Sequence, residues 1–185
     1  MDLESIFPEI EAIEDETLAQ SVSSAWTTAA EQNGIELSEL ETVPWFPPAQ
    51  RELEINAEDA LLIDHVRDVT NCAIALAETL GDRPWIRDLE VDTVIGGALV
   101  HDISKLYEFD GMERTDIGRL LGHPYFGVAV ASRANLPTEI LHIILSHTSR
   151  TAVEPATLEA EIVRRADEVA AAGIRAQAVT DLRDT

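Results

Sequence analysis

Apolar side chains recur along the chain at three- and four-residue steps, which is the spacing that keeps one stripe on one side of a helix. A helix is predicted over residues 15–32, where Asn33-Gly34 supplies a stop, and another over residues 59–80, where Gly81 ends the run. The stripe of the first helix consists of Leu18, Val22, Trp26 and Ala29 or Ala30. The stripe of the second consists of Leu62, Val66, Val69, Ala73, Leu76 and Leu80.

Shorter helical runs follow in the second half of the chain. Pro124 and Pro137 each suit the first turn of a helix, and Gly173 is expected to cap the last one. Asp110-Gly111 marks a turn, and the run 115–121 is too short to assign. The four helices predicted here cover residues 89–100, 124–133, 137–147 and 157–172.

No segment alternates apolar and polar residues as a strand does, so the pattern predicts an all-α fold. The stretch TVPWFPPA, residues 42–49, is interrupted by prolines and is expected to form a connector without regular helix. Trp45 and Phe46 are expected to pin this connector onto the core. Residues 1–58 are therefore interpreted as a helical extension with its connector, and residues 59–185 as the main helical bundle.

Composition changes this picture mainly through charge. The chain of 185 residues has 35 acidic residues, 13 basic residues and a formal net charge of −22. Only one of the basic residues, Lys105, is a lysine. Such a surface repels nucleic acid polymers and anionic lipid, yet a metal can dominate the field inside one pocket and admit a small anion. Abundant carboxylates with almost no lysine are typical of adaptation to high salt, so we expect a halophilic protein.

Two further features bear on the cellular compartment. The single cysteine, Cys72, excludes an intrachain disulfide and is expected to be a small buried residue rather than a nucleophile. The first residues, MDLESIFPEI, lack the basic and long apolar regions of a signal peptide, and no apolar run reaches the length of a membrane span. We therefore expect a cytoplasmic protein without a membrane partner.

Metal-competent side chains lie in, or at the end of, different predicted helices, which is how a helical bundle builds a metal site. Imidazoles suit Fe, Mn, Co, Ni or Zn, and carboxylates can bridge two ions. Neighbours on a helix point about 100° apart, so the adjacent His101 and Asp102 reach one site only where a helix ends. Any one histidine alone is more often a satisfied polar residue than a ligand. The candidate ligands are His65, His101, Asp102, His123, His147 and Asp167.

The order of these residues resembles the signature of the HD superfamily of metal-dependent phosphohydrolases, H…HD…D, in the subgroup with two intervening histidines. The local motifs HDISK, GRLLGH and LSHT are similar to those of the HD domain of YhaM-type exoribonucleases, and the resemblance covers roughly residues 60–172. It implies an HD-domain helical bundle over residues 59–185. It also implies that His65, His101, Asp102 and Asp167 bind a first metal, and that Asp102 bridges to a second metal held by His123 and His147.

In this interpretation the cofactors are two divalent ions, with Mn, Fe, Ni, Co or Zn as candidates, and a water activated between them is the nucleophile. Lys105, three residues after Asp102, is expected to neutralise a substrate phosphate or the leaving group. Its pairing with Glu108 or Asp110 is the structural alternative.

Two other residues are weaker candidates for the site. Arg119 is a candidate phosphate contact, or a partner of a surface acid. Asp68 is a candidate for orienting His65 or for acid–base catalysis. Thr148 stands where the relatives have a second histidine, and His142 is expected to point away from the site.

Neither the five-stranded barrel that guides RNA in the YhaM-type enzymes nor a basic groove is visible in residues 1–60, so an RNA substrate does not transfer with the core. The absence of a GYP element after the ligand set likewise gives no support to cyclic-di-GMP hydrolysis. The leading hypothesis is a phosphomonoesterase or phosphodiesterase acting on a nucleotide or another small phosphorylated molecule. A di-iron oxygenase and a non-catalytic, metal-bound module that binds a ligand or partner remain alternatives. The apolar stripe of the first helix leaves a homodimer open.

Overall fold

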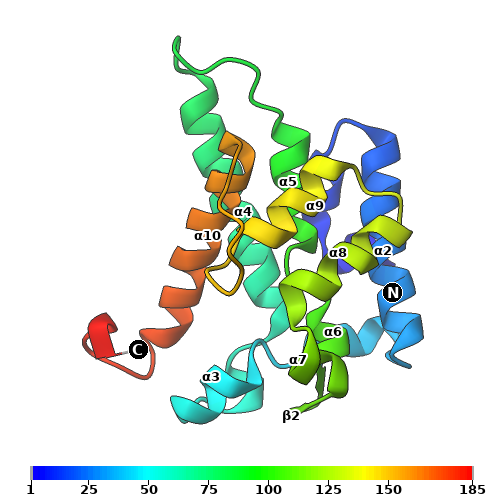
Figure 1. Cartoon of the computed structure of the whole chain (residues 1–185), viewed down its shortest axis with the longest axis vertical. Helices are drawn as coiled ribbons and strands as arrows, with labels where there is room; N and C mark the ends of the chain where they lie inside the picture. The colour runs from blue at the N-terminus through cyan, green and yellow to red at the C-terminus, as the bar shows by residue number, and fades with distance from the viewer. Residues whose placement is uncertain (1, 185) are drawn as a thin grey trace.

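The computed structural model describes residues 2–184 as a bundle of helices with one hairpin of two very short strands (Figure 1). The predicted all-α class is confirmed. The α-helices are α1 Leu3–Ile6, α2 Glu16–Gln32, α3 Pro47–Glu52, α4 Leu62–Gly81, α5 Val91–Val100, α6 Lys105–Glu108, α7 Asp116–Leu120, α8 His123–Arg133, α9 Thr138–Ser146 and α10 Leu158–Arg175. The 3₁₀ helices are η1 Pro8–Ala12, η2 Leu37–Thr42, η3 Ala57–Asp59 and η4 Leu182–Asp184, and the strands are β1 Phe109–Asp110 and β2 Glu113–Arg114.

Helix α5 is the centre of the bundle. It packs against α2, α4, α9 and α10, and α4 and α10 lie side by side (Figure 1). The helix is apolar on all sides, and every residue from Val94 to Val100 is buried. Gly97 permits the close approach of α9, because a Cβ there would lie 2.5 Å from Cδ1 of Ile143. The carboxyl end of α5 is therefore held in the interior of the protein.

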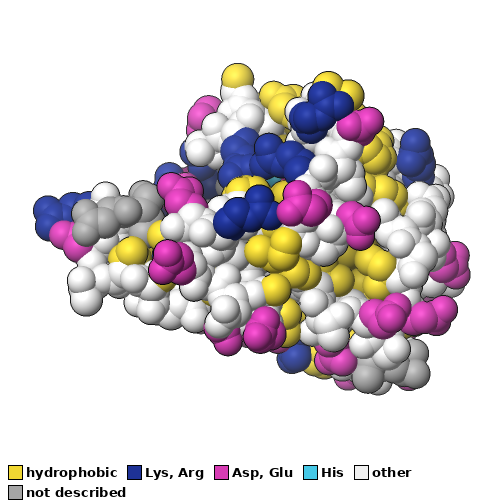
Figure 2. All heavy atoms as spheres, turned by 90° about the horizontal axis from the view of Figure 1, so that it is seen from below, with side chains coloured by type: hydrophobic (Ala, Val, Ile, Leu, Met, Phe, Trp, Pro, Cys, Tyr) yellow, Lys and Arg dark blue, Asp and Glu magenta, His cyan; other side chains and the backbone are white. Residues whose placement is uncertain are grey.

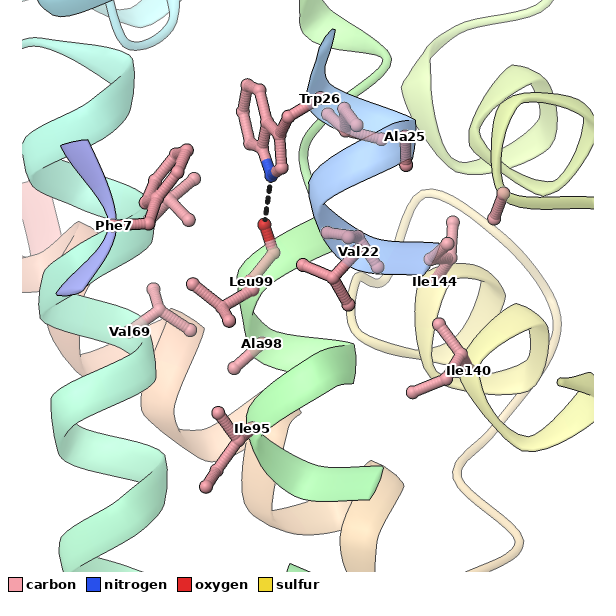
Figure 3. Close-up of a cluster of buried hydrophobic side chains, with 14 of the residues drawn as sticks. Phe7, Val22, Ala25, Trp26, Val69, Ile95, Ala98, Leu99, Ile140 and Ile144 are labelled. Carbon is pink, nitrogen blue, oxygen red and sulfur yellow. Dashed lines mark hydrogen bonds between the residues drawn. The ribbon is translucent and has the colours of Figure 1, made fainter. Parts of the chain in front are cut away.

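The N-terminal segment packs onto this central helix. Asp15 caps α2 by accepting from the backbone N–H groups of Thr17 and Leu18, and the predicted apolar stripe of α2 is buried. The indole Nε1 of Trp26 donates to the carbonyl oxygen of Leu99 at 2.9 Å (Figure 3). That carbonyl belongs to the last turn of α5, where carbonyls lack partners within the helix. The N-terminal extension thus holds the end of α5. The domain boundary predicted at residue 58 remains a prediction.

Local predictions failed at three places. Helix α3 begins inside the proline-rich connector, because Pro47 and Pro48 occupy a first turn, where no N–H is needed. Helix α10 continues through Gly173 to Arg175, so this glycine is not a cap; the cost of about 1 kcal/mol for glycine inside a helix is tolerated there. The predicted turn at Asp110-Gly111 joins β1 to β2, which the sequence did not predict.

Trp45 and Phe46 are buried as expected, but they belong to a second, smaller apolar cluster with Ile55, Ala60 and Ala171. Cys72 is a free thiol and is half-buried rather than fully buried. No helix among residues 2–184 combines the length and the apolar character needed to cross a membrane.

Candidate metal centre

The adjacent His101 and Asp102 lie where α5 ends at Val100. The chain then turns tightly: the N–H of Ile103 donates to the carbonyl of Val100, and the N–H of Lys105 donates to the carbonyl of Asp102. Leaving the regular helix lets the two neighbouring side chains point into the same space, as the sequence analysis expected. Both are buried in the middle of the bundle.

The other candidate ligands come from four further helices. His65 lies on α4 and Asp167 on α10, His123 is the first residue of α8, and His147 directly follows α9. Their ligand atoms fall into two groups, and within each group the atoms lie within 4.8 Å of one another. The groups, which share Asp102, are His65, His101, Asp102 and Asp167, and Asp102, His123 and His147. The structure therefore brings together all six residues that the sequence singled out.

The two carboxylate oxygens of Asp102 face different histidines. Oδ2 lies 3.4 Å from Nε2 of both His65 and His101. Oδ1 lies 3.6 Å from Nε2 of His123 and 3.8 Å from Nε2 of His147. A carboxylate with one oxygen toward each set of imidazoles has the arrangement of a bridging ligand.

Hydrogen bonds on the far side of three imidazole rings direct their Nε2 atoms toward this centre. Nδ1 of His101 donates to the carbonyl of Ala98 at 2.6 Å, and Nδ1 of His147 donates to the carbonyl of Ile144 at 2.8 Å. Because a carbonyl only accepts, the proton of a neutral ring sits on Nδ1 and the lone pair sits on Nε2. Nδ1 of His123 contacts Oε2 of the buried Glu108 at 3.2 Å.

Several polar atoms at the centre have no hydrogen-bond partner within residues 2–184. They are Nδ1 and Nε2 of His65, Nε2 of His101 and Oδ1 of Asp102. A buried polar atom without a partner costs about 1–3 kcal/mol, so such atoms rarely cluster without a reason. Convergent imidazole nitrogens and carboxylate oxygens are the donor set that first-row transition metals prefer. The residues present therefore fit a divalent metal.

The charges of the site suit ligand duty. Burial alone raises the pKa of the Asp102 carboxyl, but the ammonium of Lys105 and the neighbouring His101 ring outweigh burial and hold this pKa well below its ordinary value. Burial and the neighbouring His101 lower the pKa of His147 to about 3. At neutral pH Asp102 is therefore ionised and His147 is neutral, which are the forms that bind metals.

Lys105 lies at the rim of the centre. Its Nζ is 2.5 Å from Oδ2 of Asp102, so it pairs with the shared carboxylate rather than with Glu108 or Asp110. The ammonium also lies over two aromatic rings, 5.5 Å from the Trp45 centroid and 5.2 Å from the Phe46 centroid. It borders a cavity of about 80 Å³ whose lining includes Asp102, His123, His147, Asp167 and Thr148.

Two predicted site residues lie elsewhere. Arg119 is exposed and pairs with Asp116 at 2.7 Å, which is the surface alternative. Asp68 is also exposed, and because Nδ1 of His65 has no hydrogen-bond partner in the described chain, the predicted orienting bond from Asp68 is wrong. Three residues along α4 the side chain is turned by about 60° from that of His65, and Asp68 lies on the exposed edge of this helix face. His142 stays outside the centre, as expected, and its Nε2 accepts from the N–H of Ala156.

Other residues of the site were not predicted from the sequence. Arg150 and Arg175 line the cavity together with Trp45 and Phe46, which were assigned only a packing role. Arg150 lies shortly after the LSHT motif, and this position in the sequence could have pointed to it. Arg175 lies beyond the predicted end of its helix, so no motif pointed to it. Glu108 was considered only as a partner of Lys105.

An all-α bundle that gathers histidines and aspartates from five helices around one shared carboxylate defines a protein with a buried metal-binding centre. The particular family follows from comparison with known proteins: the family model described as HD domain matches residues 62–172, and the chain belongs to this family. HD domains bind divalent metals, in agreement with the donor set described above.

One curated relative is named dihydroneopterin 2',3'-cyclic phosphate phosphodiesterase and comes from Methanocaldococcus jannaschii. It is 35% identical over 113 residues, which cover 58% of this chain and 45% of the relative. The chain thus matches less than half the length of that relative. No solved structure matches the chain.

The contact between Glu108 and His123 leads to a first prediction. Replacing Glu108 by Gln keeps a hydrogen-bond acceptor but removes the charge that makes the imidazole more basic. We expect divalent metal to bind about tenfold more weakly to the group that contains His123, measured by calorimetric titration of the metal-free protein. Glu113→Gln, on the exposed strand β2, is the matched control and should bind as the wild type does. Equal affinities in the two variants would contradict a positioning role for Glu108.

Proposed function

We propose that the protein is a metal-dependent phosphohydrolase that hydrolyses a small phosphoester at a dinuclear centre. The observation that carries the proposal is the carboxylate of Asp102, whose Oδ2 faces His65 and His101 and whose Oδ1 faces His123 and His147. Membership of the HD domain family and the name of the curated phosphodiesterase relative support it. The substrate class is a nucleotide, a cyclic phosphodiester or another small phosphorylated molecule.

In this function His65, His101, Asp102 and Asp167 would hold one ion, and Asp102, His123 and His147 the other. When bound, such ions lower the pKa of a coordinated water and polarise the phosphoryl oxygens. Asp102 orients both sets of ligands, and the hydrogen bonds from Nδ1 of His101 and His147 keep their rings in the ligand tautomer.

Lys105 and the aromatic wall act on the substrate. The ammonium of Lys105 is buried beside the shared carboxylate and is positioned to donate to a phosphoryl oxygen or to the leaving oxygen as negative charge develops there. Trp45 and Phe46 keep bulk water from this ammonium, and low exposure to water strengthens its attraction for an anion. A larger hollow of about 590 Å³ also borders Lys105 and offers space for the organic part of a substrate.

The test is a hydrolysis panel on protein purified in high salt. It contains a phosphomonoester (p-nitrophenyl phosphate), a phosphodiester (bis-p-nitrophenyl phosphate), and nucleoside 2',3'- and 3',5'-cyclic phosphates. We expect hydrolysis that is lost on chelation and restored by Mn²⁺ or Fe²⁺, and the preferred compounds will distinguish monoesterase from diesterase activity.

Two outcomes of this panel would overturn the proposal. Metal that stays bound without hydrolysis of any phosphoester points to a non-catalytic module. Turnover that requires oxygen points to a di-iron oxygenase.

A further inference from the structure

Two arginines stand at the outer end of the cavity over the metal centre. Together with two aromatic residues they form what we call the aromatic–arginine wall: Trp45, Phe46, Arg150 and Arg175. The guanidinium carbon of Arg150 lies 4.3 Å from the centroid of the Phe46 ring, and that of Arg175 lies 6.0 Å from the centroid of the Trp45 ring. On the face of the protein seen from below, Lys and Arg side chains gather beside hydrophobic ones (Figure 2).

Within residues 2–184, no carboxylate pairs with either of these two arginines. Neither guanidinium makes a hydrogen bond or an ion pair anywhere in residues 2–184, although the chain carries 35 acidic residues. A guanidinium that stacks on a ring uses its face and keeps its in-plane N–H donors available for carboxylate or phosphate oxygens. Six other arginines pair with carboxylates, namely Arg51, Arg67, Arg119, Arg164, Arg165 and Arg183. The remaining four make no ion pair within residues 2–184, but none of them lines the cavity over the metal centre: Arg83, Arg87, Arg114 and Arg133.

The wall comes from different parts of the chain, and hydrogen bonds hold the segment that carries its two aromatic residues. The buried amide of Gln50 accepts from the N–H of Phe46 and donates to the carbonyls of Asn56 and Ala60. This network fixes the connector that carries Trp45 and Phe46. The two aromatic residues and Arg175 all lie outside residues 62–172, the part that matches the family. Only Arg150 of the four wall residues therefore lies inside the matched region.

The positive side chains of the cavity differ in their exposure to solvent, which increases from the metal centre outward. Lys105 is buried beside Asp102, Arg175 is half-buried, and Arg150 is exposed. A phosphoryl group at the metal ligands is already served by Lys105. The two arginines line the same cavity as the metal ligands, so a second group of a bound substrate can contact them there. Positive charge at the mouth also offsets the repulsion between a substrate anion and a protein of net charge −22.

We propose that the aromatic–arginine wall binds a second anionic group of the substrate, a carboxylate or a phosphate, separate from the phosphoryl group at the metal centre. This inference rests on the proposed function and narrows its substrate class. The substrate is a small phosphoester with a second negative charge, and Arg150 and Arg175 determine the preference for it. Arginine suits this role because its planar fork binds two oxygens of one anion together.

The test uses binding rather than turnover. The Mn²⁺-loaded full chain is titrated calorimetrically with 3-phosphonopropionate and 4-phosphonobutyrate, which carry a terminal carboxylate, and with ethylphosphonate and propylphosphonate, which do not. None of these probes contains a hydrolysable phosphoester. We expect the carboxylated probe of at least one length to bind the wild type at least about tenfold more tightly than the alkylphosphonate that lacks the carboxylate, as one charged hydrogen bond provides. In the double variant Arg150→Gln, Arg175→Gln this ratio should fall to about one.

Arg165→Gln is the matched control, because this arginine lies on α10 but pairs with Glu161 and Glu168 away from the cavity. It should keep the wild-type ratio. Equal binding of both probe types by the wild type, or a ratio that persists in the double variant, would overturn the inference. A hydrolysis panel without activity would overturn the proposed function alone, because the binding ratio does not depend on turnover.

Discussion

Replacement of Asp102 by Asn is expected to remove both bound metal and phosphoester hydrolysis. Asp102 is the one residue common to both groups of ligands, and its two oxygens face different pairs of histidines. The amide of asparagine is neutral and offers one oxygen, so the group with His123 and His147 keeps no charged ligand and the other group keeps only Asp167. Because metal ions contribute several kcal/mol to the transition state, we expect hydrolysis to fall by roughly 10³-fold or more. Metal content is measured by mass spectrometry on the same samples.

The matched control for this variant is Asp116→Asn, which removes an exposed carboxylate whose one ion-pair partner in residues 2–184 is Arg119. It should keep wild-type metal content and activity, apart from the small contribution of a surface ion pair to stability. If the Asp102 variant kept its metal and most of its activity, the shared-carboxylate arrangement would have no role in the chemistry.

The second large effect is expected at Lys105. Lys105→Met preserves the length and the apolar stem of the side chain but removes the ammonium that lies 2.5 Å from Asp102. We expect metal to stay bound while kcat falls about 10²–10³-fold, the range seen when one electrostatic donor to a transition state is removed. Steady-state kinetics on the best compound of the panel, together with metal analysis, separate the two quantities.

Lys105→Arg is the informative companion variant. The ammonium fits between the Asp102 carboxylate and the Trp45 and Phe46 rings, where a larger planar fork does not present a compact charge at the same point. We therefore expect arginine to restore little of the lost activity. Full activity in either variant would show that Lys105 has only a structural pairing with Asp102.

Most of the helical architecture could be predicted from the sequence, because apolar periodicity records which face of each helix is buried. The buried stripes of α2 and α4 contain most of the positions expected for them, such as Val22 and Val69. The prediction was wrong for Leu76, which is exposed near the end of α4. Helix ends were harder to predict. Helix α10 continues past Gly173 to Arg175, and Pro47 favours the start of α3 as much as it breaks the preceding segment. Glycine and proline therefore constrain where a helix ends without determining it.

The metal centre could be predicted because its residues are recognised by type and order. A histidine followed by an aspartate at the end of an apolar helix, with further histidines on later helices, describes the centre without coordinates. Contacts made by residues around the ligands could not be predicted in this way. Arg119 was a candidate because it stands in a motif beside His123, yet its nearest partner is Asp116, one turn away on the same helix. The predicted hydrogen bond between Asp68 and His65 was wrong because a spacing of three residues places two side chains on a common helix face only approximately.

The sequence by itself determined the helical class, the six candidate ligands and the singular lysine, since these depend on local periodicity, residue chemistry and order along the chain. Only the tertiary structure decided that the two oxygens of Asp102 face different histidines, that Glu108 contacts His123, and that Arg150 and Arg175 meet Trp45 and Phe46 over the centre. The physical reason is that these contacts join segments far apart in the chain. Their distances depend on how whole helices pack around α5, and no local pattern of residues carries that information.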